Sequence, residues 1–309
     1  MTFEFDSEVQ TSVDGAPVID LSDIPAFQAA MAAAPAAPPF EPAPGVDVTT
    51  VHATGDAPVD LIVVRPEGEG SRPLVLWFHG GGFVMGDAAE SVPFLDRAAR
   101  EAGVVGASIQ YDLAPAATYP APIDQAVTAL TWLLANADEF GIDPNRIVVG
   151  GQSAGAAHAI TLALRLRDQG GPRLAFQLLD IPVTDDRVAT QSASEYTDTP
   201  VWNTANARSS WAAYLGDVTD AVVPARVDDL SGLPPAFVTV GQFDPLRDEG
   251  IEYARRLAHA GVLTELHLYP GTYHGSASIA ADAQVSRRQN TDLIDALCRA
   301  VATNEGASA

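Results

Sequence analysis

Ser153 stands at the centre of the pentapeptide Gly151-Gln-Ser-Ala-Gly155, which fits the pattern G-x-S-x-G. The strand-like run Arg146–Gly150 precedes it, and the Ala/Leu-rich run Ala154–Leu166 follows with helical spacing. A sharp turn between a strand and a helix exposes the central serine for attack on a carbonyl carbon. Glycines beside the serine avoid the clash that Cβ atoms would cause in so tight a turn. Because the helix N-terminus also favours negative charge, the pattern predicts Ser153 as a nucleophile.

A nucleophilic serine needs a base within hydrogen-bond reach, and the base needs an acid that orients it. Of the six histidines, His274 is the best base, because its loop Pro270–Gly275 follows the last expected strand at the sheet edge where Ser153 emerges. His158 lies on the helix that begins after Ser153, but its spacing places it on a different face. The histidines inside expected strands or helices are interpreted as structural: His52, His259 and His267.

Asp244 is the best orienting acid, because it follows the strand-like run Ala236–Gly241 and lies in a loop at the same sheet edge. Pro245 is typical of the first position of a helix. Asp248 and Glu249 then fall in the first helical turn, where the helix dipole stabilises negative charge. We therefore expect Asp244 to be the orienting acid, and Asp248 and Glu249 to be charges of the first helical turn that the helix dipole stabilises.

The motif His79-Gly-Gly-Gly-Phe83 directly follows the apolar run Pro73–Phe78. Adjacent glycines leave backbone N–H groups uncovered, and such groups form an oxyanion hole together with the N–H after a nucleophilic serine. A nucleotide-binding loop is disfavoured, because the G-x-G-x-x-G spacing is missing. We expect His79 and Gly80 to support this loop, with His79 as a hydrogen-bonding group rather than the base. The oxyanion hole is expected to consist of the N–H groups of Gly81, Gly82 and Ala154.

Strand-like and helical runs alternate from about residue 46 onward, which predicts a mainly parallel sheet with helices on both faces. Eight strands are expected, at 46–53, 59–65, 73–78, 104–110, 146–150, 174–180, 236–241 and 264–269. Helices are expected at 18–31, 90–102, 123–140, 154–166, 246–260 and 285–302. The alternation breaks between Val183 and Leu233, a stretch that carries four Trp and Tyr residues. We interpret it as an insertion over the carboxyl edge of the sheet, where α/β sheets bind ligands; the aromatic residues can equally serve to hold the insertion together.

Composition narrows the function further. The chain has 309 residues, 47% of them hydrophobic, and a net charge of -23. Every one of its 17 basic residues is arginine, which excludes lysine Schiff-base chemistry and a P-loop lysine. The strong negative charge argues against a nucleic-acid partner.

A single cysteine, Cys298, excludes an internal disulfide. No apolar run is long enough to span a membrane, and an acidic N-terminus without a positive signal region favours the cytoplasm.

With these motifs in place, the chain resembles the hormone-sensitive-lipase-like group of α/β-hydrolase esterases over roughly residues 50–303. The order Ser153, Asp244, His274 is the order of catalytic residues in α/β-hydrolases. Four segments carry the resemblance: His-Gly-Gly-Gly-Phe at 79–83, Tyr-Asp-Leu-Ala-Pro at 111–115 with Tyr-Pro-Ala-Pro at 119–122, the serine pentapeptide at 151–155, and Asp-Pro-Leu-Arg-Asp-Glu-Gly at 244–250.

The resemblance implies an α/β-hydrolase fold with an eight-stranded, mainly parallel sheet and a helical cap. Residues 1–45 would form an N-terminal cap segment and residues 184–224 a cap insertion, with the core at 46–183 and 225–309. It implies hydrolysis of short- to medium-chain carboxylic esters through an acyl-enzyme on Ser153, without metal or organic cofactor. The partner is then a small ester, and a homodimer is compatible with the sequence. An amidase or lactonase would use the same triad, and a non-catalytic small-ligand receptor would be expected to lose one of its members.

The sequence departs from the family pattern at three positions. Gln152 replaces the usual aspartate before the serine, and Asp112 replaces the usual arginine after Tyr111. Ser276 stands where the family has phenylalanine two residues after the histidine. The first two change charge near the site or its supports, and the third removes an apolar wall, so the acyl-chain preference does not follow from the resemblance.

Overall fold

Eight strands form one sheet in the order β1-β2-β4-β3-β5-β6-β7-β8 in the computed structural model, which describes residues 3–35 and 38–302. The β1–β2 and β2–β4 pairings are antiparallel, and the other neighbours are parallel. The predicted eight-stranded, mainly parallel sheet is therefore confirmed. The strands are β1 (Val46–Ala53), β2 (Val59–Pro66), β3 (Arg72–Phe78), β4 (Val105–Ile109), β5 (Ile142–Gln152), β6 (Phe176–Asp180), β7 (Ala236–Gly241) and β8 (Thr264–Tyr269).

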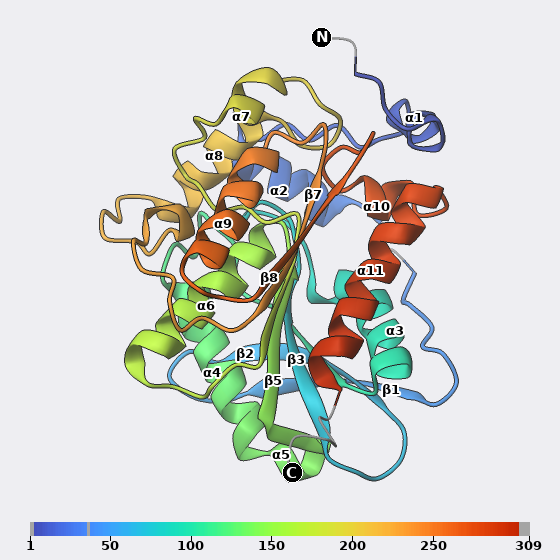
Figure 1. The fold of residues 1–309 in the computed structure, drawn as a ribbon, viewed down its shortest axis with the longest axis vertical. Coiled ribbons are helices and arrows are strands. Elements are labelled where there is room, and N and C mark those ends of the chain that lie inside the picture. The colour runs from blue at the N-terminus through green and yellow to red at the C-terminus, as the bar shows by residue number, and fades with distance from the viewer. Residues whose placement is uncertain (1–2, 36–37, 303–309) are drawn as a thin grey trace.

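Helices cover both faces of the sheet, as the alternation predicts (Figure 1). One apolar cluster joins the sheet to α4 (Ala121–Ala135), α6 (Ala154–Gln169) and α9 (Arg247–His259). A second cluster joins the opposite face to α3 (Val92–Ala102) and α11 (Gln284–Val301). Strands β4 and β7 are buried along their whole length, as strands of a sheet covered on both faces should be.

Three expected helices differ at their ends from the structure. The expected helix 18–31 is α2 (Ile24–Ala33), because the Asp23 carboxylate caps it by accepting from the Ala26 N–H at 3.0 Å. The expected helix 123–140 is interrupted at Asn136, which separates α4 from α5 (Ala137–Phe140). The start of the expected helix 90–102 is a 3₁₀ turn, η1 (Ala88–Ser91), that leads into α3.

The N-terminal segment and the insertion after β6 pack together above the carboxyl ends of the strands. A third apolar cluster joins α2 to α7 (Gln191–Glu195) and α8 (Thr204–Leu215), and it includes Phe83 of the glycine loop and Ala154 of α6. The first helix, α1 (Ser7–Val13), contacts Tyr273 through Val9. The predicted cap and core boundaries stay a prediction. The remaining elements are η2 (Pro224–Arg226) and α10 (Ser276–Ile279).

Within residues 3–35 and 38–302, the structure contains no helix that is both long and apolar enough to cross a membrane.

Candidate active site

The turn between β5 and α6 holds Ser153 in a backbone conformation that few residues adopt. Its φ is 55° and its ψ is -118°, outside the main allowed regions for a residue with a Cβ. The close packing of the turn explains its two glycines. A Cβ on Gly151 would lie 2.4 Å from the carbonyl carbon of Gly155, and a Cβ on Gly155 would lie 2.2 Å from the Phe78 carbonyl oxygen. The strand-to-helix turn therefore requires glycine on both sides of Ser153.

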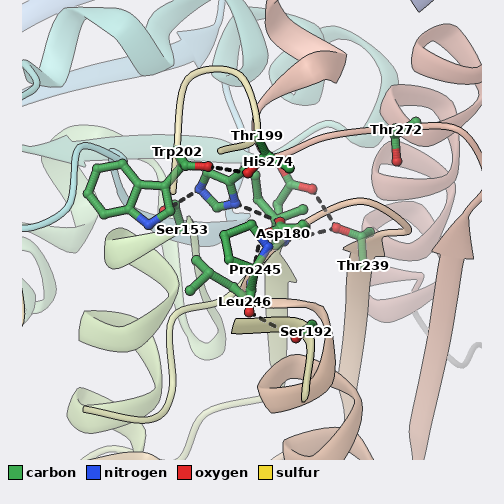
Figure 2. Close-up of polar contacts among 12 residues, drawn as sticks. Ser153, Asp180, Ser192, Thr199, Trp202, Thr239, Pro245, Leu246, Thr272 and His274 are labelled. Atoms are coloured by element: carbon green, nitrogen blue, oxygen red, sulfur yellow. Dashed lines mark hydrogen bonds and ion pairs between the residues drawn. The ribbon is translucent and has the colours of Figure 1, made fainter. Parts of the chain in front are cut away.

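The structure brings Ser153, His274 and Asp244 into one hydrogen-bonded chain. The Ser153 hydroxyl lies 2.8 Å from Nε2 of His274, and Nδ1 of the same ring lies 2.7 Å from a carboxylate oxygen of Asp244. Figure 2 shows the first of these contacts. All three side chains are buried, with Ser153 and His274 each only 5% exposed. The second Asp244 oxygen accepts the Leu246 N–H at 2.8 Å, which fixes the carboxylate against rotation.

The glycine loop after β3 presents backbone N–H groups beside Ser153. Within the described part of the chain, the N–H groups of Gly81 and Gly82 donate to no protein acceptor. Ala154 is the first residue of α6, so its N–H has no acceptor in a preceding turn of that helix. Gly81 has a φ of +115°, and a Cβ there would lie 2.1 Å from the Met85 carbonyl oxygen. Uncovered N–H groups of this kind are suited to binding a developing oxyanion.

His79 supports the glycine loop through hydrogen bonds and stacking, and its imidazole is neutral. Its Nδ1 donates to the Gly80 carbonyl oxygen at 2.7 Å, and its ring stacks on Tyr111 with the centroids 4.2 Å apart. The Tyr111 hydroxyl also donates to the His79 carbonyl oxygen at 2.9 Å. Burial lowers the pKa of His79 to about 4, although its bond to Gly80 opposes this shift. These contacts are those of a residue that supports the loop. His79 is not hydrogen-bonded to Ser153, His274 or Asp244.

His158 lies under the same loop, buried among aromatic rings. Its ring is 5.3 Å from that of Phe83 and 4.7 Å from that of Tyr111. Burial, together with a smaller effect of the nearby His79, lowers the pKa of His158 to about 3. Because the ring is neutral, it behaves as a packing residue of the loop support, in line with its exclusion as the base.

His79 and His158 make the fold sensitive to acid. Each folded-state pKa lies below the unfolded value of about 6.5, so the unfolded chain binds more protons between the two values and stability falls as the pH falls through this range. We expect each histidine to remove about 2 kcal/mol of unfolding free energy between pH 6.5 and 4.5. In His158→Phe, which keeps an aromatic ring, the loss over that interval should be about 2 kcal/mol smaller than in the wild type. Urea unfolding at both pH values measures this difference, and equal losses in the two proteins would contradict it.

The acidic residues after Asp244, which are Asp248 and Glu249, lie in the first turn of α9, as the sequence predicts, and they also bind residues of the insertion. Glu249 is 3% exposed, and one of its carboxylate oxygens accepts the N–H groups of Thr184 at 2.6 Å and Asp185 at 3.3 Å. Burial raises the pKa of Glu249 well above its usual range, while these two bonds act against the shift. Asp248 accepts the Ser192 N–H at 2.8 Å. Both carboxylates therefore anchor the insertion to α9, because their partners lie in residues 184–192.

A buried carboxylate that sequence reasoning missed lies behind the serine. Asp180, at the end of β6, is 3% exposed and accepts hydrogen bonds from three side chains. Its carbonyl oxygen also accepts the Ser153 N–H at 2.8 Å. Figure 2 includes part of this network. The donors are Gln152 at 2.9 Å, Thr239 at 2.5 Å and Gln289 at 2.8 Å. Gln152, which departs from the family pattern, thus supplies a neutral donor where a second carboxylate would repel Asp180.

Of the other two departures, Asp112 has a side-chain partner and Ser276 is buried. Asp112 and Gln125 exchange two hydrogen bonds, of 2.9 and 2.8 Å, at the start of the segment that leads to α4. Ser276 is buried and begins α10. In the described ranges 3–35 and 38–302, no three or more His, Cys, Asp or Glu side chains are grouped to hold a metal ion.

Comparison with known proteins places this geometry in a recognisable context. A family model described as alpha/beta hydrolase fold matches residues 75–278. Esterase LipI of Mycobacterium tuberculosis is 38% identical over 217 residues, which are 69% of this chain and 68% of that protein. Carboxylesterase NlhH of the same species is 40% identical over 215 residues, 67% of each. The solved structure of a bacterial heroin esterase is 41% identical, with a TM-score of 0.88 over 97% of this chain and 99% of that one.

Proposed function

Because the chain belongs to the hormone-sensitive-lipase-like family of α/β-hydrolases, we propose that Ser153, His274 and Asp244 carry out its hydrolysis of carboxylic esters. The predicted family and the predicted serine carboxylesterase are both confirmed by the relatives, which are named esterases. The roles of the individual residues and the range of esters are our proposal. A homodimer and a cytoplasmic location stay predictions.

The reaction begins with proton transfer from Ser153 to His274. Nε2 of His274 lies 2.8 Å from the serine hydroxyl and removes its proton as the oxygen attacks the ester carbonyl carbon. The resulting imidazolium is stabilised by the Asp244 carboxylate on its other nitrogen. His274 then gives the proton to the leaving alcohol oxygen, and the acyl group remains bound to Ser153.

Water releases the acyl group by the same sequence in the second step. His274 removes a proton from the water, the hydroxide attacks the acyl carbonyl, and the proton returns to Ser153 as the carboxylic acid leaves. In both steps the negative oxygen of the tetrahedral intermediate accepts N–H groups from Gly81, Gly82 and Ala154. The dipole of α6, which begins directly after Ser153, favours the same negative charge.

One observation carries the proposal: two hydrogen bonds, of 2.8 and 2.7 Å, connect the three side chains in the order nucleophile, base, acid. We propose short- to medium-chain acyl groups as the range, which is what the resemblance to this family of esterases implies.

A labelling experiment combined with matched substrates tests the proposal. An aryl organophosphate should modify Ser153 and no other residue, as peptide mass spectrometry would show, and esterase activity should decline in step with the modification. Phenyl esters of increasing acyl length should be hydrolysed with a maximum at short or medium chains. The matched anilides should react far more slowly. An unlabelled Ser153 in an active protein would refute the assignment, and equal rates on esters and anilides would indicate an amidase.

A further inference from the structure

Trp202 of the insertion covers the reacting centre that the proposed function describes. A Cβ on Gly82 would lie 2.2 Å from Cη2 of Trp202, so the six-membered ring of the indole lies directly on the Gly82 backbone. The indole is also 6.0 Å from the His274 ring, between centroids. Figure 2 shows Trp202 beside Ser153 and His274, with its nitrogen edge turned toward Ser153. The indole is therefore positioned over both the oxyanion loop and the base.

The indole nitrogen of Trp202 has an unused N–H. The side chain is 3% exposed, and within the described residues its Nε1 has no hydrogen-bond partner. A buried donor without an acceptor is unfavourable, and native structures generally pair such groups. An acceptor supplied by a bound substrate would satisfy it.

A tight turn fixes the position of Trp202. The Trp202 N–H donates to the Pro200 carbonyl oxygen at 2.7 Å, and the Thr199 hydroxyl donates to the Trp202 carbonyl oxygen at 2.6 Å. Val201 between them has a φ of 65°, which is strained for a β-branched residue. Strained backbone of this kind is found where a side chain must be held in a defined place beside a ligand.

We propose that Trp202 limits the size of the ester beside its scissile carbonyl and donates its indole N–H to the bound ester. The inference rests on the proposed function, because it takes the carbonyl carbon to be bonded to Ser153 with its oxygen near the Gly82 N–H. A substituent on that carbon then meets the indole, since the ring covers Gly82 and approaches His274. The substrate class that follows is an ester compact around the carbonyl, with an acceptor oxygen on the indole side.

Trp211 provides a matched control within the same insertion. It is also 3% exposed and also has a buried Nε1 without a partner in the described chain. Its ring packs on Phe83, with the centroids 4.9 Å apart, and on Tyr214 at 6.1 Å. The three atoms that approach Gly82 most closely all belong to Trp202 instead. The two tryptophans therefore share burial and chemistry but differ in their place relative to the reacting centre.

Substrate profiles of Trp202→Ala and Trp211→Ala test the size limit. One series varies the acyl group on phenol, and the other varies the alcohol on acetate. In Trp202→Ala, the ratio of kcat/KM for the largest ester to that for the smallest should rise more than about tenfold in at least one series. Which series changes identifies the side of the carbonyl that Trp202 covers. The ratio should stay within about twofold of wild type in Trp211→Ala. Unchanged profiles in Trp202→Ala, or equal changes in Trp211→Ala, would overturn the proposal.

Trp202→Phe tests the hydrogen bond separately, because it keeps an aromatic ring and removes the N–H. We expect kcat/KM for the smallest ester to fall about fivefold, as for one neutral hydrogen bond, with the size profile retained. Trp211→Phe should change it less than about twofold. Equal effects in the two variants would refute the donor role.

Organophosphate titration separates this inference from the proposed function. Labelled Ser153 counts the folded, competent sites in each variant, so that kcat/KM is compared per competent site. If Ser153 is labelled and the Trp202 profiles are flat, only the role of Trp202 fails. If active wild-type protein is not labelled at Ser153, the proposed function itself fails. Should Trp202→Ala not fold, Trp202→Leu provides the same comparison with more of the packing kept.

Discussion

Replacement of Ser153 by alanine is expected to lower kcat for ester hydrolysis by about 10⁵- to 10⁶-fold, the range found when a triad nucleophile is removed. The change deletes the one oxygen that bonds to Nε2 of His274. Alanine retains the Cβ, so the packing of the turn between Gly151 and Gly155 should persist. The residual rate would come from water attacking an ester held by the oxyanion loop.

A nearby hydroxyl serves as the control for this variant. Ser278 on α10 lies 3.5 Å from the Gln152 side-chain nitrogen and is not bonded to His274. Ser278→Ala should therefore keep kcat within about threefold of wild type, since it removes only a weak surface contact. Steady-state hydrolysis of phenyl acetate, with circular dichroism to verify folding, measures both variants. Substantial turnover by folded Ser153→Ala would refute the acyl-enzyme on this residue.

Asp244→Asn should lower kcat by about 10⁴-fold without unfolding the protein. The Asp244 carboxylate accepts a hydrogen bond from the Nδ1–H of His274, with the two atoms 2.7 Å apart. Nε2 is then unprotonated and free to accept the serine proton. An asparagine that keeps its oxygen on the Leu246 N–H turns its amide NH₂ toward Nδ1. His274 then carries its proton on Nε2 and cannot serve as the base.

Asp248 is the matched control for the Asp244 variant. It lies four residues further along the chain. Its carboxylate accepts a hydrogen bond from the Ser192 N–H and none from a histidine. Asp248→Asn can keep this bond through its amide oxygen, so kcat should change less than about threefold. The pair separates loss of charge near α9 from loss of the specific contact to His274. Near wild-type kcat in Asp244→Asn would remove Asp244 from the orienting role.

The sheet and the positions of the three proposed catalytic residues are predictable from the sequence because each depends on local pattern. Ser153 follows a strand and opens a helix, and His274 and Asp244 follow two other strands. In a parallel sheet the loops after these strands lie at one edge. Alternation of apolar runs and turns therefore places the three side chains together before any contact between them is known.

The environment of Glu249 depends instead on residues far away in the chain. The N–H groups that donate to its carboxylate belong to Thr184 and Asp185, which lie 65 and 64 positions earlier. The local pattern predicts a carboxylate in the first turn of a helix, stabilised by the helix dipole, and gives no partner for it. Only the three-dimensional position of the insertion makes it a buried anchor.

The role of Asp180 also depends on residues that are distant in the sequence. In the sequence it is the last residue of an expected strand, and its donors Thr239 and Gln289 are 59 and 109 positions away.

Helix ends are also hard to predict where no residue marks them. The interruption at Asn136 between α4 and α5 has no Gly or Pro to mark it.

The glycines on either side of Ser153 perform no chemistry, yet they cannot be exchanged, since β5, α6 and the end of β3 leave no volume for a methyl group. A descendant of this chain that lost its serine would still have to keep both glycines to fold. The two glycines are thus required by the fold of the turn, whereas the serine between them is required by the activity. Relatives with an intact G-x-x-x-G but a different central residue would be inherited scaffolds, free to evolve toward recognition of ligands without turnover.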